Sequence, residues 1–229
     1  YDGCVAYVDH QVGRLVSTLK DLGVFDKTIV VIASDHGELL GEHSMYFHHF
    51  SLYEENVHVP LVFHYAGHVP AARQVEDLCE NVDIYPTLAE LAGLEVPAGL
   101  SGQSLVPVWQ GRAGGREGVL AEHARNAAVS WRTEKWSYLY QPMAVPANRE
   151  HLPAKWLEGP FGYWVQHAKA EELYDRENDP GETTDLSASL GEVVSELRKE
   201  ASVWIENCDA IWATGKYTVG GATASTMKP

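Results

Sequence analysis

The first 22 residues carry apolar side chains at spacings of three and four, the pattern of an amphipathic helix with one apolar face. This stripe comprises Val5, Val8, Val12, Leu15, Val16, Leu19 and Leu22. Gly23 follows directly and suits the end of a helix, because glycine readily adopts the left-handed backbone common there. The next apolar segment, TIVVIA at residues 28–33, shows no alternation. Such a continuous run predicts a strand buried on both faces, as in the interior of a parallel sheet covered by helices.

A second strand and a second helix are predicted further along the chain. Residues 59–65 (VPLVFHY) have strand character, and DIYPTLAELAGL predicts a helix from Asp83 onward. Asp83 suits the N-cap, Pro86 falls in the first turn and Gly93 ends the pattern. The order helix, strand, loop, strand, helix is typical of an α/β domain.

A change in composition near residue 110 divides the chain. The stretch QGRAGGREG holds four glycines and predicts a linker or loop. Three stretches beyond it, GVLAEHA, AAVSWRTE and KWSYLYQP, predict short antiparallel strands. We therefore expect two domains and a tail. Their bounds are 1–110 for the larger domain, 117–207 for the smaller one (with an irregular insertion at 142–170 and a helix at about 186–207), and 208–229 for the tail.

The acidic balance of the chain excludes one class of partner. Its 229 residues include 32 Asp and Glu against 17 Lys and Arg, a formal net charge of −15. Nucleic acids need a basic footprint on the protein, so no nucleic-acid partner is expected. No segment approaches the roughly 20 apolar residues of a membrane span, so no membrane span is expected. The chain begins inside a helical pattern without an initiator methionine, and we interpret it as part of a longer protein.

Side chains that bind metals gather directly after the first predicted strand, in the sequence SDHGE. Ligands in α/β sheets collect at the carboxyl ends of the strands, where the chain turns and neighbouring side chains can converge. Asp35 offers carboxylate oxygens, His36 offers an imidazole nitrogen, and Gly37 permits a close backbone approach. A divalent cation needs at least one more ligand from elsewhere. The alternative is a helix cap followed by a surface histidine, which the pair alone does not exclude.

Several motifs in series resemble the second half of the sulfatase family. They are VDHQVGRLVSTLKDLGVFDKTIVVIASDHGELLGEH, SLYEENVHVPLVF, DIYPTLAELAGLEVPAGLSGQSLVPVWQG, and EELYDRENDPGETTDL, which is similar to the family's C-terminal ELYDL-x-x-DPxE signature. The resemblance covers residues 1 to about 186 in the family's order and spacing. It implies an α/β fold, namely the C-terminal part of an alkaline-phosphatase-like sandwich. Residues 1–110 would belong to the main α/β domain, and a small subdomain would follow, with an antiparallel sheet and a packed helix.

The resemblance also implies roles for individual residues. In that family the Asp-His or Asp-Asn pair after this strand binds a divalent cation, usually calcium, which carries over to Asp35 and His36; manganese, magnesium and zinc are alternatives. A basic residue, usually Lys, lies shortly before the LYEE element and contacts the sulfate. No Lys stands in FHHFSLYEE: counting back from LYEE puts His49 in its place, and counting forward from SDHGE puts His48. Either imidazole, when protonated, can bind an ester oxygen and donate to the leaving group.

The sequence also supports expectations for three further residues and one acidic stretch. His123 follows VLAE at a predicted strand end and is a candidate for the wall of the substrate pocket. Arg132 lies in SWRTEKWSYLY, which resembles a mostly architectural stretch of the family. His43 is expected on an exposed loop. The acidic stretch from Asp175 to Glu182 is expected to be a solvated turn.

Two features of the family are absent from this sequence. Members carry an Asp-Asp pair near the N-terminus and a C-x-P-x-R stretch whose Cys becomes formylglycine; none of Cys4, Cys79 and Cys208 lies in that motif. We therefore expect the N-terminal half of the same enzyme to be a partner that supplies formylglycine, and this chain alone to be inactive. The resemblance implies metal-dependent, arylsulfatase-like hydrolysis of small-molecule or carbohydrate sulfate esters. The alternatives are a phosphonate or phosphate diester hydrolase, a phosphoethanolamine-type transferase of the same superfamily, or a non-catalytic metal-binding remnant.

Overall fold

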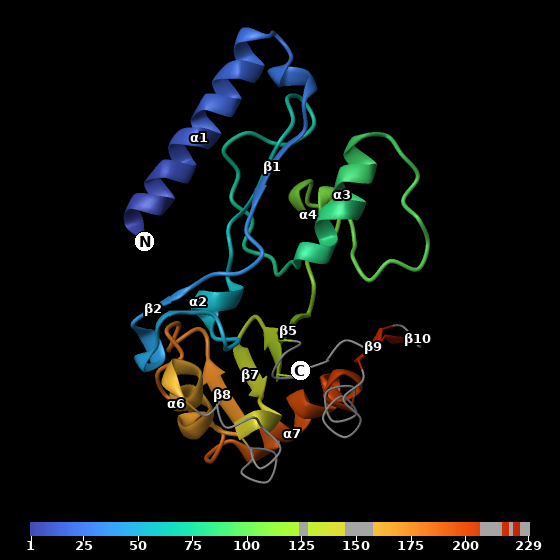
Figure 1. Cartoon of the computed structure of the whole chain (residues 1–229). Helices are drawn as coiled ribbons and strands as arrows, with labels where there is room; N and C mark the ends of the chain where they lie inside the picture. The colour runs from blue at the N-terminus through green and yellow to red at the C-terminus, as the bar shows by residue number, and fades with distance from the viewer. Residues whose placement is uncertain (124–127, 145–157, 207–216, 220–221, 225–229) are drawn as a thin grey trace. The chain divides into compact units, whose positions relative to one another are not determined.

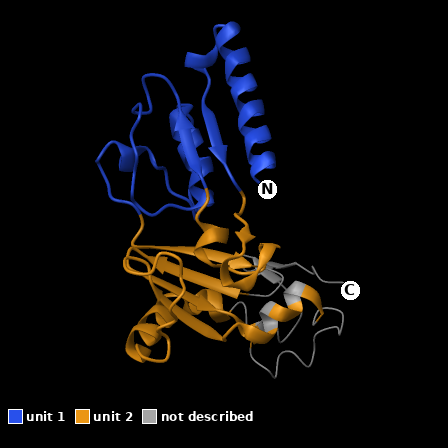
Figure 2. Ribbon diagram, turned by 90° about the vertical axis from the view of Figure 1, so that its left-hand side faces the viewer, with its two compact units in different colours: residues 1–34, 60–115 blue, residues 35–59, 116–229 orange. Residues whose placement is uncertain are grey.

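The structure is a computed structural model, and it describes residues 1–123, 128–144, 158–206, 217–219 and 222–224 (Figure 1). The chain divides into two compact units that do not follow its order (Figure 2). Unit 1 comprises residues 1–34 and 60–115, and unit 2 comprises residues 35–59 and 116–229. Segment 35–59, which contains most of the predicted site, therefore groups with the C-terminal part of the chain.

The first helix is confirmed by the structure of unit 1. Helix α1 (Asp2–Asp21) is followed by Gly23 with a φ of 67°, the left-handed conformation expected after a helix, and by the short helix η1 (Phe25–Lys27). No residue of α1 is buried. The apolar stripe that predicted the helix is thus present but lies largely open, with Val8 and Leu15 more than half exposed.

The prediction of a parallel, doubly buried strand is wrong. Strand β1 (Val30–Ala33) pairs with β4 (Leu61–His64) in antiparallel register, and its residues are half-buried or exposed. Between the two strands the chain forms segment 35–59, which belongs to unit 2. Because the chain returns to the end of β1 at which it left, the second strand must run in the opposite direction. The predicted second strand itself is confirmed as β4.

The remainder of unit 1 contains η3 (Asn81–Asp83), α3 (Ile84–Leu91) and α4 (Val106–Trp109). The buried side chain of Asp83 links these elements by hydrogen bonds. Asp83 occupies the predicted N-cap position of α3, but its side chain makes no capping bond there. Instead its fully buried carboxylate accepts from the backbone N–H of Glu80 at 2.9 Å and of Gln103 at 2.8 Å. It therefore ties the loop before α4 to the start of α3.

The predicted antiparallel sheet of the smaller domain is confirmed in unit 2. Its strands lie in the order β5 (Gly118–His123), β6 (Ala128–Thr133), β7 (Trp136–Tyr140) and β8 (Glu171–Asp175). Helix α7 (Gly191–Glu200) packs on one face of this sheet. That core contains Val129, Tyr138, Leu173, Leu197, Ala201 and Ile205.

The opposite face of the sheet is covered by segment 35–59. This segment contains the two-stranded hairpin of β2 (Leu39–Leu40) and β3 (Tyr46–His48), joined by η2 (Glu42–Ser44), and then α2 (Glu54–Val57). The shared core comprises Leu39, Met45, Leu52, Tyr53, Ala128, Leu139 and Tyr174. Neighbouring residues of each sheet strand thus alternate between the two cores, so both faces are buried.

Three expectations for the C-terminal part of the chain differ from the structure. The helix expected at about 186–207 begins as α7 at Gly191, after a turn in which Leu186 N donates to Leu173 O at 2.8 Å. Within the irregular insertion expected at 142–170, the described residues form η4 (Pro142–Ala144) and α6 (Gly159–His167), whereas 145–157 lie outside the described residues. The tail expected at 208–229 includes an antiparallel pair, β9 (Tyr217–Val219) with β10 (Ala222–Ala224).

None of the helices within the described ranges combines the length and the apolar character needed to cross a membrane.

Candidate functional site

The backbone directly after β1 is held against the start of α2. Gly37 N donates to Asn56 O at 2.9 Å, and a Cβ placed on Gly37 would lie only 1.9 Å from Glu55 O. Asn56 is itself buried, and its side chain donates to Ser51 O at 3.0 Å. Only glycine permits this close approach, so the residue type at position 37 fixes where the preceding Asp-His pair lies.

Asp35 and His36 are arranged so that one oxygen and one ring nitrogen face each other. His36 N donates to Asp35 Oδ1 at 3.0 Å, and His36 Nδ1 lies 2.8 Å from Gly37 O. Because a carbonyl oxygen only accepts, Nδ1 carries the proton of a neutral His36 and Nε2 carries the lone pair. Nε2 in turn lies 4.0 Å from Asp35 Oδ2.

This geometry fits two ligands of one divalent cation. Metal–ligand bonds of about 2.0–2.5 Å place neighbouring ligand atoms roughly 3–4 Å apart, which matches the separation of Asp35 Oδ2 and His36 Nε2. Across the described ranges, no group of three or more His, Cys, Asp or Glu residues is arranged to hold a metal ion. Two ligands do not complete a metal site, so a site built on this pair needs further ligands.

A β-bulge in the β2–β3 hairpin lies directly before the two candidate histidines and sets their register. Leu39 pairs with His48 and Leu40 pairs with Tyr46, so Phe47 is one extra residue in β3, and its φ is 57°. Cross-strand partners share a face of a hairpin, so His48 lies on the face of Leu39, which is fully buried. Without the extra residue, the register on this side of the hairpin would shift by one position.

The structure brings His49 together with His36. The ring of His49 stacks on that of His36, with centroids 4.2 Å apart and planes 26° from parallel. Its Nδ1 lies 3.5 Å from Glu38 Oε2. The ring of His48 instead stacks on Phe50, with centroids 4.8 Å apart. The pattern of the sequence pointed to both histidines, and the geometry links only His49 to the Asp-His pair through a ring contact.

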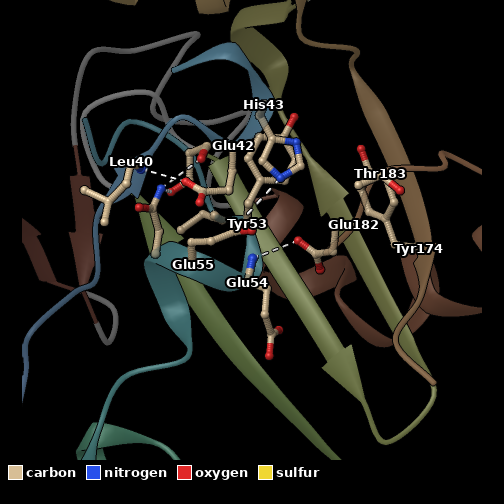
Figure 3. A network of polar contacts seen from close by, with 12 residues as sticks. Leu40, Glu42, His43, Tyr53, Glu54, Glu55, Tyr174, Glu182 and Thr183 are labelled. Atoms are coloured by element: carbon tan, nitrogen blue, oxygen red, sulfur yellow. Dashed lines mark hydrogen bonds and ion pairs between the residues drawn. The ribbon is translucent and has the colours of Figure 1, made fainter. Parts of the chain in front are cut away.

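A second cluster of polar side chains surrounds His43 (Figure 3). Its ring stacks on Tyr53 with centroids 3.6 Å apart, and its Nε2 lies 3.6 Å from Glu55 Oε2. Only 13% of the His43 side chain is exposed, so the expectation of an exposed loop histidine is wrong. Burial raises the pKa of Glu55, but the facing His43 and a backbone hydrogen bond outweigh burial and hold that pKa below its usual range.

A buried carboxylate links this cluster to the sheet. Glu172 Oε2 accepts from the hydroxyls of Tyr53 at 2.9 Å and Tyr174 at 2.7 Å, and Glu172 Oε1 accepts from Lys169 N at 3.0 Å. Burial, reinforced by the charge of this carboxylate, raises the pKa of both tyrosine hydroxyls far above their usual range. Both hydroxyls therefore stay protonated and act as donors to Glu172.

Arg132 and Glu182 form a buried ion pair that also contacts the segment from Leu52 to Glu54. Arg132 Nη1 lies 2.8 Å from Glu182 Oε1 and 2.7 Å from Glu54 Oε2, and its Nη2 donates to Leu52 O at 2.7 Å. Glu182 Oε2 also accepts from Glu54 N at 2.8 Å (Figure 3). The architectural role expected for Arg132 agrees with these contacts. The expectation that the acidic stretch ending at Glu182 is solvated is wrong for Glu182, because its side chain is fully buried against the guanidinium.

His123 lies at the end of strand β5, opposite Ala128 of β6. Its Nδ1 is buried. Its place in the wall of a substrate pocket stays a prediction.

Comparison with solved structures defines the class of fold. The structure of BT4656 in complex with its substrate D-glucosamine-2-N,6-O-disulfate matches 88% of this chain and 39% of its own, with a TM-score of 0.67 and 26% identity. The phosphonate monoester hydrolase of Agrobacterium radiobacter matches 98% of this chain and 44% of its own, with a TM-score of 0.65 and 25% identity. The architecture is therefore part of an alkaline-phosphatase-like fold.

Comparison of sequences then gives the family. A family model described as Sulfatase matches residues 1–94. Arylsulfatase K of Bos taurus is 33% identical over 209 residues, which is 86% of this chain and 34% of that protein. The family model and these relatives support a place for the chain in the sulfatase family. The chain spans about a third of the length of the curated relatives it matches.

Proposed function

We propose that this chain supplies the metal-binding and anion-binding part of an enzyme that hydrolyses sulfate esters. The observation that carries this proposal is the packing of His49 on the Asp35–His36 pair, with ring centroids 4.2 Å apart. A cation ligand pair and a potential anion donor thus occupy one small region at the end of β1. Hydrolysis of a sulfate ester needs both. The cation offsets the negative charge of the transferred group, and the donor assists departure of the leaving oxygen.

Asp35 and His36 are the residues that would hold the divalent cation, and calcium is the expected ion, with manganese, magnesium and zinc as alternatives. The lone pair on His36 Nε2 and the exposed carboxylate of Asp35 support this assignment. When bound, such a cation polarises the ester oxygens of the substrate as a Lewis acid. Formylglycine is expected in a part of the enzyme outside this sequence, in which no Cys lies in C-x-P-x-R.

His49 is the residue we assign to the sulfate, in place of the Lys usual in the family. Its ring contact with His36 supports it over His48, which lies on the buried face of the hairpin and stacks on Phe50. A donating Nε2–H of His49 would hold an ester oxygen and assist the leaving group. His123 is retained as a candidate for the wall of the pocket.

The proposed substrates are small-molecule or carbohydrate sulfate esters. The names of the relatives support this class, because one is an arylsulfatase and BT4656 binds a sulfated glucosamine. A phosphonate or phosphate ester is the second candidate, and the similarity to a phosphonate monoester hydrolase favours it. The partner we expect is the N-terminal half of the same enzyme.

The test uses the complete product of the gene that encodes this chain, assayed on 4-nitrophenyl sulfate and on a 4-nitrophenyl phosphonate ester. We expect calcium-dependent hydrolysis of the sulfate, lost in Asp35→Asn and retained in Asp26→Asn, a matched change at an exposed residue outside the site. Faster hydrolysis of the phosphonate than of the sulfate would support the second candidate. Hydrolysis of neither ester would leave a non-catalytic metal-binding role.

Metal binding is tested separately on the 229-residue chain by calorimetric titration with calcium and with manganese. Loss of a residue that only hydrogen-bonds a metal ligand lowers metal affinity by about 10–100-fold. Asp35→Asn changes a proposed ligand itself, so it should weaken binding by more than about 100-fold. Equal affinity in the Asp35→Asn and Asp26→Asn variants would remove Asp35 from the metal site.

A further inference from the structure

We propose that Glu38 is a positioning residue for His49, whose carboxylate fixes which nitrogen of that imidazole faces the sulfate ester. The carboxylate oxygen Oε2 of Glu38 lies 3.5 Å from His49 Nδ1. This inference rests on the proposed function, because it deepens the role assigned there to His49. The distance is longer than that of most hydrogen bonds, and substrate binding can shorten a contact of this kind.

Glu38 is not an ordinary surface glutamate. Only 20% of its side chain is exposed, and its Oε1 is buried without a hydrogen-bond partner among the described residues. It directly precedes Leu39, which is fully buried in the core of unit 2 and anchors the backbone at this point. A carboxylate that is held inward with an unsatisfied oxygen is costly, so its position calls for a function.

The ring contacts of His49 do not determine which edge of its imidazole faces Glu38, and the carboxylate of Glu38 does. Stacking on His36 fixes the plane of the imidazole, and Phe50 lies further off with its centroid 6.0 Å away. A stacked ring can still turn over in its own plane, which exchanges the edges that carry the two nitrogens. A carboxylate only accepts, so it selects the orientation with Nδ1–H toward Glu38. Nε2 then occupies the edge away from the carboxylate. When the ring carries both protons, the Nε2–H on that edge can donate to a substrate oxygen.

The β-bulge explains why His49 is in reach of Glu38. Glu38 immediately precedes β2, and Leu39 pairs with His48, so His49 follows the residue opposite Leu39 on the neighbouring strand. The extra residue Phe47 sets this register. The strained φ of Phe47, 57°, is the cost of bringing His49 rather than its neighbour beside Glu38.

The direct test is the tautomer of His49, read from long-range proton–nitrogen correlation spectra of the 229-residue chain. The spectra are recorded well above the ordinary imidazole pKa of about 6.5, so that the rings are neutral. The His49 signals are assigned from their loss in His49→Gln. We expect the Nδ1–H tautomer in the wild type and in Glu38→Gln, which keeps an acceptor oxygen. In Glu38→Ala we expect a shift toward the Nε2–H tautomer that a free histidine favours.

The matched control is Glu42→Ala, which removes the same charge from the same hairpin. Glu42 is exposed, and its carboxylate accepts from Leu40 N at 2.6 Å rather than facing His49. The Nδ1–H tautomer of His49 should persist in this variant. An unchanged tautomer in Glu38→Ala, or the same change in Glu42→Ala, would overturn the proposal.

A kinetic test applies to the complete gene product. Glu38→Ala should lower kcat on a sulfate ester by about 10–100-fold with little change in KM, the size of effect typical when the orienting partner of a functional histidine is lost. Glu38→Gln should restore most of the rate. The loss should be larger for an alkyl sulfate than for 4-nitrophenyl sulfate, because a poorer leaving group depends more on proton donation.

The two levels of failure are distinguishable. Wild-type protein that hydrolyses no sulfate ester would contradict the proposed function, while the tautomer experiment would still decide the role of Glu38. Active wild-type protein whose kcat and His49 tautomer are both unaffected by Glu38→Ala would contradict the positioning role alone.

Discussion

The imidazole of His43 lies flat on the phenol ring of Tyr53, with centroids 3.6 Å apart and planes only 6° from parallel. Tyr53 in turn donates its hydroxyl to Glu172 of strand β8. A residue of the hairpin loop is thereby coupled to the central sheet of unit 2 through one aromatic contact and one hydrogen bond. The candidate site lies within the segment that this contact stabilises.

Loss of this stack should destabilise unit 2. We expect His43→Ala to lower the free energy of unfolding by about 1–2 kcal/mol, since an aromatic pair contributes roughly 0.5–1.5 kcal/mol beyond the area it buries. Urea denaturation followed by tyrosine and tryptophan fluorescence measures the difference. His58→Ala is the matched control, because the His58 side chain is 76% exposed and stacks on no aromatic ring among the contacts described above. That control should stay within about 0.5 kcal/mol of the wild type.

The depressed pKa of Glu55 predicts a specific response to acid. Its pKa in the folded protein lies below the ordinary 4.5, so its ionised form stabilises the fold above that pH. This contribution is lost as the pH falls below 4.5 and through the folded-state pKa. We expect Glu55→Gln to flatten this part of the stability profile relative to the wild type, measured by urea denaturation at stepped pH. A variant whose profile has the same slope as the wild type in this range would show that Glu55 is not responsible.

Replacing one member of the Arg132–Glu182 pair should destabilise the fold more than replacing both. Arg132→Met leaves the buried carboxylate of Glu182 uncompensated, which costs about 3–5 kcal/mol. The double variant Arg132→Met, Glu182→Met removes both charges and should recover much of that loss. Thermal unfolding of the two single variants and the double variant gives the coupling energy. Additive losses would contradict a direct pairing.

Gly37 should not tolerate even the smallest side chain. In Gly37→Ala the new Cβ meets the carbonyl oxygen of Glu55, a backbone atom that has little freedom to move away. We expect a loss of about 3 kcal/mol or more, the upper range for an overpacked site, together with weaker calcium binding at the displaced Asp-His pair. Gly13→Ala in α1 is the control: nothing lies within 4 Å of its Cβ, and alanine favours the helix.

Local patterns were sufficient for the elements whose formation depends on their own residues. The spacing in α1, the glycine that follows it and the alternating strands of the C-terminal sheet all appear as expected. Proximity of Asp35 and His36 follows from their adjacency and the turn at Gly37. The resemblance to the sulfatase family limited the proposed sulfate-binding position to two neighbouring histidines, His48 and His49.

Relations across the chain were beyond those patterns. The apolar run of β1 looks the same whether its partner is parallel or antiparallel, and the partner is decided by where segment 35–59 returns. Glu182 stands in a polar stretch, and only the distant Arg132 explains its burial. The alternation of apolar and polar residues does not reveal the bulge at Phe47, yet the bulge determines which histidine contacts His36.

The discontinuous make-up of unit 2 has a consequence for how such genes can diverge. Arg132 and Glu172 belong to the part after residue 116, but their partners Glu54 and Tyr53 belong to segment 35–59. An exchange of gene segments between relatives at the glycine-rich stretch near residue 115 would combine one ancestor's guanidinium and carboxylate with another ancestor's partners. Recombinants should therefore stay stable only where the residues on both sides of these contacts match. Segment 35–59 and the part after residue 116 should then be inherited together, although residues 60–115 of unit 1 lie between them.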